Sequence, residues 1–182
     1  MQNAIGLIEL TSIAKGYEVA DALLKTAEVE IVFNRTICPG KFMVMVAGDT
    51  AAVNSSIAAG LDLAGDTVVD DLIIPNIHPE VFPAISGTRA IEKTEALGII
   101  ETFSVASIIE AADAAVKAAD VQLIEIHLAM AIGGKGYVTL TGEVAAVRAA
   151  VEAGADYIRN KGLLVSKVVI PQPREEILQD KI

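Results

Sequence analysis

The stretch Ala4-Ile5-Gly6-Leu7-Ile8-Glu9 decides the fold, because it returns as Ala96-Leu97-Gly98-Ile99-Ile100-Glu101, 92 positions later. Between residues 4–29 and 96–121, 13 of 26 positions are identical. After a two-residue insertion, residues 40–62 match residues 134–156 at 10 of 23 positions. A period of this length is too long for a solenoid unit, so each copy is a domain of its own.

Each copy predicts the order strand, helix, strand, strand, helix, strand. The first helix shows an apolar face at intervals of three or four residues, and both helices follow residues that favour an N-cap. A turn at Cys38-Pro39-Gly40 separates the two middle strands. This βαββαβ order is typical of a ferredoxin-like α+β domain. In the first copy we expect strands at 4–10, 30–37, 42–46 and 71–74, a helix capped by Thr11 or Ser12, and a helix over 51–64 capped by Asp49 or Thr50.

The repeat predicts a first domain over residues 1–83, a linker over 84–95 and a second domain over 96–182. The linker contains Ser86-Gly87-Thr88 and charges of both signs. A four-stranded sheet with helices on one face leaves its other face and its edges to be covered. Self-association is one way to supply that cover.

The composition excludes several classes of protein. Hydrophobic residues make up 53% of the 182, but charges and glycines interrupt every apolar run before the roughly 18 residues of a membrane helix. A net charge of −10 and the lack of tryptophan argue against nucleic-acid binding. The start of the chain has no signal-type pattern, and a single cysteine excludes an internal disulfide. We therefore expect a cytoplasmic protein with no nucleic-acid or membrane partner.

The sequence resembles the tandem-domain, trimer-forming shell proteins of bacterial microcompartments along nearly its whole length. The resemblance lies in the repeated strand at 4–9, in Ala20-Asp21-Ala22-Leu23-Leu24-Lys25 with its twin at 112–117, in the glycine-rich loops, and in the Ile-Pro that ends each copy. It implies a homotrimer of two unpermuted domains per chain that mimics a hexamer. It also implies a structural role in a shell, and no enzymatic activity.

The resemblance further implies lateral contacts with other microcompartment shell proteins. In that family the lysine of the repeated helix segment lies at the edge of the tile, which assigns this role to Lys25 and Lys117. The family usually has arginine after the terminal Ile-Pro, whereas this chain has Asn76 and Gln172. An edge contact made by that arginine is therefore not expected here.

Cys38 is the strongest candidate for a metal ligand. A lone cysteine is more often a small buried apolar residue, and that interpretation stays open. However, Cys38 lies in a predicted turn and precedes a proline, as the last cysteine of bacterial ferredoxin motifs does. Residues 36–42 are similar to the propanediol-utilisation type of tandem shell protein, which carries an iron–sulfur cluster at its pore. This resemblance implies one [4Fe–4S] cluster per trimer, held by three Cys38 thiolates.

Both glycine-rich loops are expected at the pore of the trimer. The second-copy loop has no cysteine, so three ligands per trimer is the natural number. Lys41 and Lys135, which follow the glycines of the two loops, either attract anions to the pore or are ordinary solvated residues. Gly133 and Gly134 are expected to let the backbone approach the axis closely. The predicted pore residues around Cys38 are Ile37, Pro39, Gly40 and Lys41 in the first copy, and Ile132, Gly133, Gly134 and Lys135 in the second.

The cluster is expected to pass electrons across the shell, with an encapsulated redox enzyme as a candidate partner, or to be delivered through it. A metal-free gated pore for metabolites is an alternative, and a trimeric ferredoxin-like ligand sensor or an enzyme is a weaker one. His78 and His127 are the only histidines, and neither belongs to a recognisable nucleophile motif.

Overall fold

The computed structural model describes residues 4–87 and 94–177. These residues form two compact units. One runs to Ile77 and includes Ser104–Ser107 and Leu128–Lys135, and the other contains the rest. The predicted boundaries at residues 83 and 96 stay a prediction, and residues 88–93 of the predicted linker lie outside the described residues.

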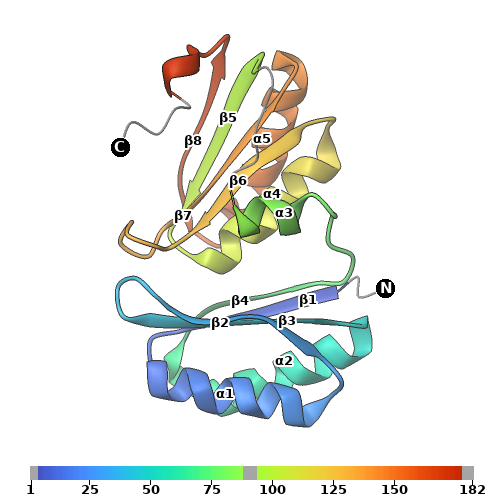
Figure 1. The fold of residues 1–182 in the computed structure, drawn as a ribbon, viewed down its shortest axis with the longest axis vertical. Helices are drawn as coiled ribbons and strands as arrows, with labels where there is room; N and C mark the ends of the chain where they lie inside the picture. The colour runs from blue at the N-terminus through green and yellow to red at the C-terminus, as the bar shows by residue number, and fades with distance from the viewer. Residues whose placement is uncertain (1–3, 88–93, 178–182) are drawn as a thin grey trace. The chain divides into compact units, whose positions relative to one another are not determined.

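The first half of the chain has the predicted βαββαβ order. Its four strands form one antiparallel sheet in the order β2-β3-β1-β4. Helices α1 and α2 cover one face of this sheet (Figure 1). The elements are β1 (Ala4–Leu10), α1 (Ile13–Thr26), β2 (Glu30–Ile37), β3 (Lys41–Gly48), α2 (Thr50–Ala64) and β4 (Val68–Ile74).

Side-chain caps set where the first two helices begin. The Ser12 hydroxyl accepts a hydrogen bond from the Lys15 amide at 3.3 Å, and the Asp49 carboxylate accepts one from the Ala52 amide at 2.9 Å. Both residues were among the predicted caps, so the helix starts are confirmed. Strand β4 begins at Val68, three residues earlier than predicted, directly after a short 3₁₀ turn at Gly65–Thr67.

Strand β1 is buried along its entire length. Alternation places Ile8 toward the helices, in a core with Leu23 and Ile57. It places Leu7 and Glu9 on the opposite, helix-free face, where Leu7 pairs with Met45 on β3 and with Leu72 on β4. The helix-free face of this first sheet is therefore also buried at its centre.

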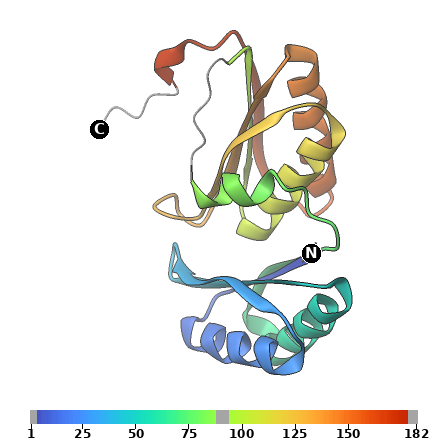
Figure 2. The ribbon, with the colours of Figure 1, turned by 45° about the vertical axis from the view of Figure 1, so that its right-hand side comes forward.

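The second half repeats the same order of elements, which confirms two unpermuted α+β domains. Its sheet has the order β6-β7-β5-β8, with α4 and α5 on one face (Figure 2). A short helix, α3 (Val81–Ser86), precedes it and was not predicted; it overlaps the start of the predicted linker. The elements are β5 (Ala96–Thr102), α4 (Val105–Ala118), β6 (Gln122–Leu128), β7 (Gly136–Gly142), α5 (Val144–Arg159) and β8 (Leu164–Pro171).

Within the described residues, no helix combines the length and the apolar character that a membrane span requires.

Candidate functional site

Cys38 lies at the tip of the hairpin between β2 and β3. Ile37 ends β2 and pairs with Lys41, the first residue of β3, so that Cys38, Pro39 and Gly40 form the connecting turn. The peptide bond between Cys38 and Pro39 is cis, and Gly40 has a φ of 81°, which glycine adopts without steric cost. The Cys38 thiol is free and half-buried. The structure thus places the candidate ligand on a turn rather than in the apolar core.

The corresponding turn of the second copy connects β6 to β7. Left-handed φ values occur at Ala129, Ala131, Gly133 and Gly134, two of which are glycines that tolerate them readily. The Lys135 amide donates to the Ile132 carbonyl at 3.4 Å, which closes the turn.

These two turns contact one another within one compact unit. The Cys38 amide donates to the Ala129 carbonyl at 3.2 Å. A Cβ atom on Gly134 would lie 2.8 Å from the Cys38 carbonyl oxygen and 2.9 Å from Pro39 Cδ. Only glycine fits this approach, so Gly134 supports the turn that carries Cys38. The predicted pore residues of the two copies are therefore neighbours in the structure.

Lys41 forms a buried ion pair with Glu9. Its Nζ lies 2.7 Å from Glu9 Oε1, and the Glu9 side chain is completely buried. Burial raises the pKa of Glu9 above its ordinary value, while Lys41 acts in the opposite direction. Glu9 was not predicted as a site residue. The pattern that could have identified it is a glutamate inside an apolar strand that occurs again as Glu101 in the repeat.

The Glu9 carboxylate also caps a helix. Its Oε2 accepts a hydrogen bond from the amide of Val105, the first residue of α4, at 3.0 Å. Nearby, the Asp70 carboxylate accepts hydrogen bonds from the hydroxyls of Ser104 and Ser107. Carboxylates at a helix N-terminus are favourable because they meet unsatisfied amides and the positive end of the helix dipole. One polar network therefore joins the base of the Cys38 turn to the start of α4.

A single chain provides one thiolate at this site. Among residues 4–87 and 94–177, no group of three His, Cys, Asp or Glu side chains is placed to hold a metal ion. A cluster bound at Cys38 would therefore need thiolates from other copies of the chain.

The two predicted edge lysines pair with aspartates one helical turn earlier. Lys25 Nζ lies 2.5 Å from the Asp21 carboxylate, and Lys117 Nζ lies 2.5 Å from that of Asp113. The first pair is exposed, whereas Asp113 is largely buried and also accepts the backbone amide of His78 at 2.7 Å. The edge role of both lysines stays a prediction.

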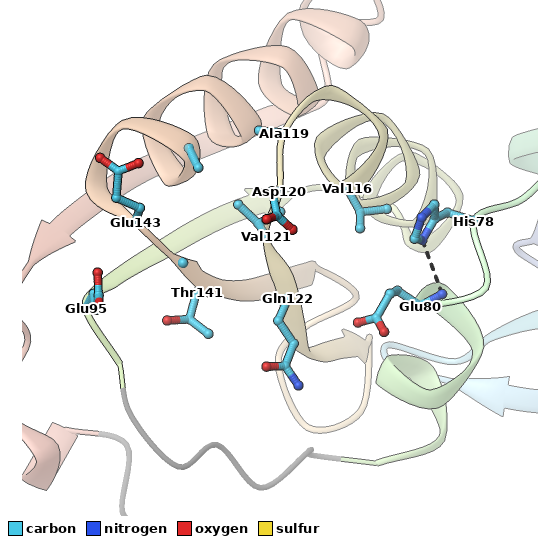
Figure 3. A pocket seen from close by; sticks show the side chains of 12 residues that line it. His78, Glu80, Glu95, Val116, Ala119, Asp120, Val121, Gln122, Thr141 and Glu143 are labelled. Atoms are coloured by element: carbon cyan, nitrogen blue, oxygen red, sulfur yellow. Dashed lines mark hydrogen bonds between the residues drawn. The ribbon is translucent and has the colours of Figure 1, made fainter.

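The two histidines lie in different surroundings. His78 lies beside a pocket of about 800 Å³ that carries the carboxylates of Glu80, Glu95, Asp120 and Glu143 (Figure 3). Its Nδ1 accepts a hydrogen bond from the backbone amide of Glu80, two residues later, at 3.3 Å.

His127 lies near the end of β6. Its ring stacks on Tyr137 with centroids 5.1 Å apart, and its Nδ1 lies 3.1 Å from the Glu125 carboxylate. The Tyr137 hydroxyl donates to the same carboxylate at 3.2 Å.

Comparisons with known proteins agree with this architecture. The BMC domain family matches residues 4–77 and again residues 96–173. The bacterial microcompartment shell protein PduT of Citrobacter freundii is 50% identical over 182 residues, covering 100% of this chain and 99% of the relative. The carboxysome shell protein CsoS1A of Hydrogenovibrio crunogenus is 47% identical over 86 residues, covering 46% of this chain and 90% of that protein.

Solved structures give the same result. A microcompartments protein from Desulfitobacterium hafniense DCB is 50% identical, with a TM-score of 0.87, covering 98% of this chain and 99% of that one. The fused permuted hexameric shell protein MSM0275 from the RMM microcompartment has a TM-score of 0.66 and 27% identity, covering 86% of this chain and 81% of that one. The chain therefore belongs to the BMC-domain family, as a tandem-domain shell protein of a bacterial microcompartment.

Proposed function

We propose that three copies of this chain form a ring-shaped shell tile, and that three Cys38 thiolates bind one [4Fe–4S] cluster at its centre. The observation that supports this most directly is the position of Cys38. It is the chain's only cysteine, and it lies half-buried on a three-residue turn. This turn packs against the glycine-rich turn of the second repeat in the same chain.

The number of ligands supports three chains. A [4Fe–4S] cube has a three-fold axis along its body diagonal, so three equivalent thiolates can bind three of its irons. The turn of the second copy has no cysteine, so only alternate turns around a ring of six domains can ligate. Three chains then supply three thiolates, and the fourth iron takes a ligand that is not cysteine.

The residues around Cys38 suit a thiolate ligand that must be held in place. The Cys38 amide is fixed by the Ala129 carbonyl, and Gly134 packs directly against the Cys38 carbonyl. Lys41 fixes the start of β3 through its contact with the buried Glu9. These contacts restrict the turn before any metal binds, which lowers the entropic cost of ligation. When bound, the cluster supplies one-electron redox chemistry.

This tile acts in a shell, and a shell is built from many protein molecules, so the protein assembles with other shell proteins. We propose that Lys25 and Lys117 lie at the edges where tiles meet. The resemblance to the propanediol-utilisation type makes an encapsulated redox enzyme the partner for electron transfer through the cluster. Delivery of the cluster itself through the pore is the alternative use of the same site.

The visible and electron paramagnetic resonance spectra of anaerobically purified protein test the cluster. We expect a brown protein whose reduced form gives an iron–sulfur signal, and we expect Cys38→Ser to lose both while staying folded. Met130→Leu is the matched control, because it removes the sulfur of the neighbouring turn and should keep the spectrum. A colourless wild-type protein after anaerobic reconstitution would instead favour a metal-free gated pore.

A further inference from the structure

Three titratable side chains contact one another on one face of the second sheet, near the end of β6. The Glu125 carboxylate lies between the other two: His127 Nδ1 lies 3.1 Å from its Oε1, and the Tyr137 hydroxyl donates to its Oε2 at 3.2 Å. The rings of His127 and Tyr137 stack nearly parallel, with centroids 5.1 Å apart. The three side chains hold one another in place, and we call them the His127 triad.

This arrangement suits a histidine that takes up a proton. A carboxylate beside Nδ1 orients the imidazole ring and stabilises its protonated, positively charged form. The side chains of His127 and Glu125 are only 28% and 25% exposed, so solvent screens their interaction incompletely. Histidine is also the side chain that ordinarily gains or loses a proton near neutral pH.

Two further charged groups belong to this part of the second sheet. Glu101 pairs with Tyr137 across β5 and β7, so it lies on the same face of the sheet. Lys135 immediately precedes β7. The first copy has no such triad, because Met43 takes the place of Tyr137 opposite Glu9, and β2 contains no histidine. The triad is therefore a feature of the second copy.

The His127 triad is linked to the Cys38 turn through the backbone. Ala129 follows His127 by two residues, and its carbonyl accepts a hydrogen bond from the Cys38 amide at 3.2 Å. Ala129 and Cys38 belong to the same compact unit. Because two residues span at most about 7 Å, the Cα atom of His127 lies within about 13 Å of the Cys38 amide nitrogen. A charge gained at the turn therefore acts on the imidazole ring.

We propose that His127 takes up a proton when the iron–sulfur cluster at Cys38 gains an electron. The inference rests on the proposed cluster and adds a pH dependence to its reduction. A one-electron donor supplies the electron, and solvent supplies the proton, which binds to a ring nitrogen of His127 and compensates the added negative charge. Glu125 is the positioning residue, since it orients the ring and stabilises the imidazolium.

The size of the coupling follows from the distance between the two sites. Over about 13 Å, at an effective dielectric constant of about 20, one unit charge changes the proton affinity of another group about tenfold. Salt reduces the effect of one triad to a few fold, and a trimer carries three triads. The reduction potential should therefore be higher at pH 5.5 than at pH 8.5, by at least about threefold in the equilibrium constant, or about 30 mV for a one-electron couple.

Redox titrations of the reconstituted trimer at both pH values, followed by electron paramagnetic resonance, measure this difference in potential. The wild type should show the difference, and His127→Gln, which cannot carry the proton, should lose most of it. Glu125→Gln should also diminish it, and it replaces His127→Gln in the test if that variant does not fold. His78→Gln is the matched control. It removes the chain's other histidine, beside the pocket at the opposite end of β6, and should keep the full difference.

The outcomes separate this inference from the proposed function. A His127→Gln trimer whose potential changes with pH as much as that of the wild type would overturn the inference and leave the cluster in place. A wild type that holds the cluster but has equal potentials at both pH values would do the same. A protein that binds no iron–sulfur cluster would overturn the proposed function, and this inference with it.

Discussion

Replacing Lys41 by methionine should destabilise the protein by up to about 3 kcal/mol at pH 7, and by much less at pH 5. The substitution removes the ammonium that lies 2.7 Å from Glu9 Oε1 and keeps an apolar side chain of similar length. Glu9 is completely buried and retains the backbone amide of Val105 as a donor. Leaving a buried charge without its partner is strongly destabilising.

Protonation of Glu9 limits the size of this effect. The ordinary glutamate pKa of 4.5 lies about two and a half units below pH 7. Each pH unit is worth about 1.4 kcal/mol, so the cost of protonating Glu9 sets a ceiling of about 3.5 kcal/mol at pH 7 and of less than about 1 kcal/mol at pH 5.

The pH dependence has a definite sign. Burial raises the pKa of Glu9 in the folded protein above its ordinary value. Stability from such a group is fully present below pH 4.5 and is lost as the pH rises through the folded pKa. Loss of Lys41 raises that pKa further, because Lys41 lowers it in the wild type, and so extends the loss to higher pH.

Urea unfolding followed by circular dichroism at pH 5 and pH 7 measures this difference. The protein concentration must be held constant, because assembly contributes to the apparent free energy of unfolding. Lys25→Met is the matched control. It breaks an ion pair whose two side chains are 73% and 61% exposed, so it should cost less than about 1 kcal/mol at either pH. If Lys41→Met behaved like Lys25→Met at pH 7, or lost equal stability at both pH values, the buried-pair interpretation would be wrong.

Two further predictions concern the turns and the edges. Gly134→Ala should weaken iron binding at Cys38 by displacing its turn, since the added Cβ meets the Cys38 carbonyl at 2.8 Å, whereas Gly133→Ala meets nothing within 4 Å and should have a smaller effect. Iron titration of the two variants compares them directly, and equal affinities would contradict the role given to Gly134. Charge reversal of both Lys25 and Lys117 should abolish sheets of tiles in electron micrographs while leaving the trimer intact, and unchanged sheets would rule out the edge assignment.

Much of the fold could be predicted because most strand, helix and turn patterns occur twice, once in each repeat. Ser12 and Asp49 identify helix starts through their own side chains, and both caps form as expected. The start of β4 was placed too late because Val68 and Val69 precede two aspartates, Asp70 and Asp71, which disfavour a strand by propensity. Asp70 nevertheless lies in β4, where it accepts hydrogen bonds from the hydroxyls of Ser104 and Ser107. Such a contact, with residues far away in the sequence, leaves no local pattern.

The candidate site was predictable only in part, for the same reason. Cys38 and the glycines were found because turns carry their own sequence signals. The partner of Lys41 was not found, because the contact with Glu9 joins residues 32 positions apart across the sheet. The sequence also did not predict that apolar side chains on α1 and on the second sheet would be exposed. Sequence shows that Ile13 and Val105 are equivalent, but only the structure shows that one is exposed and the other buried.

Native mass spectrometry of the anaerobically reconstituted protein tests the central claim most directly, because it counts chains, irons and sulfides in one particle. The proposed site predicts a single species of three chains with four irons and four sulfides, and an iron-free trimer for Cys38→Ser. Iron bound to single chains, or the same iron content in the Cys38→Ser trimer, would contradict it.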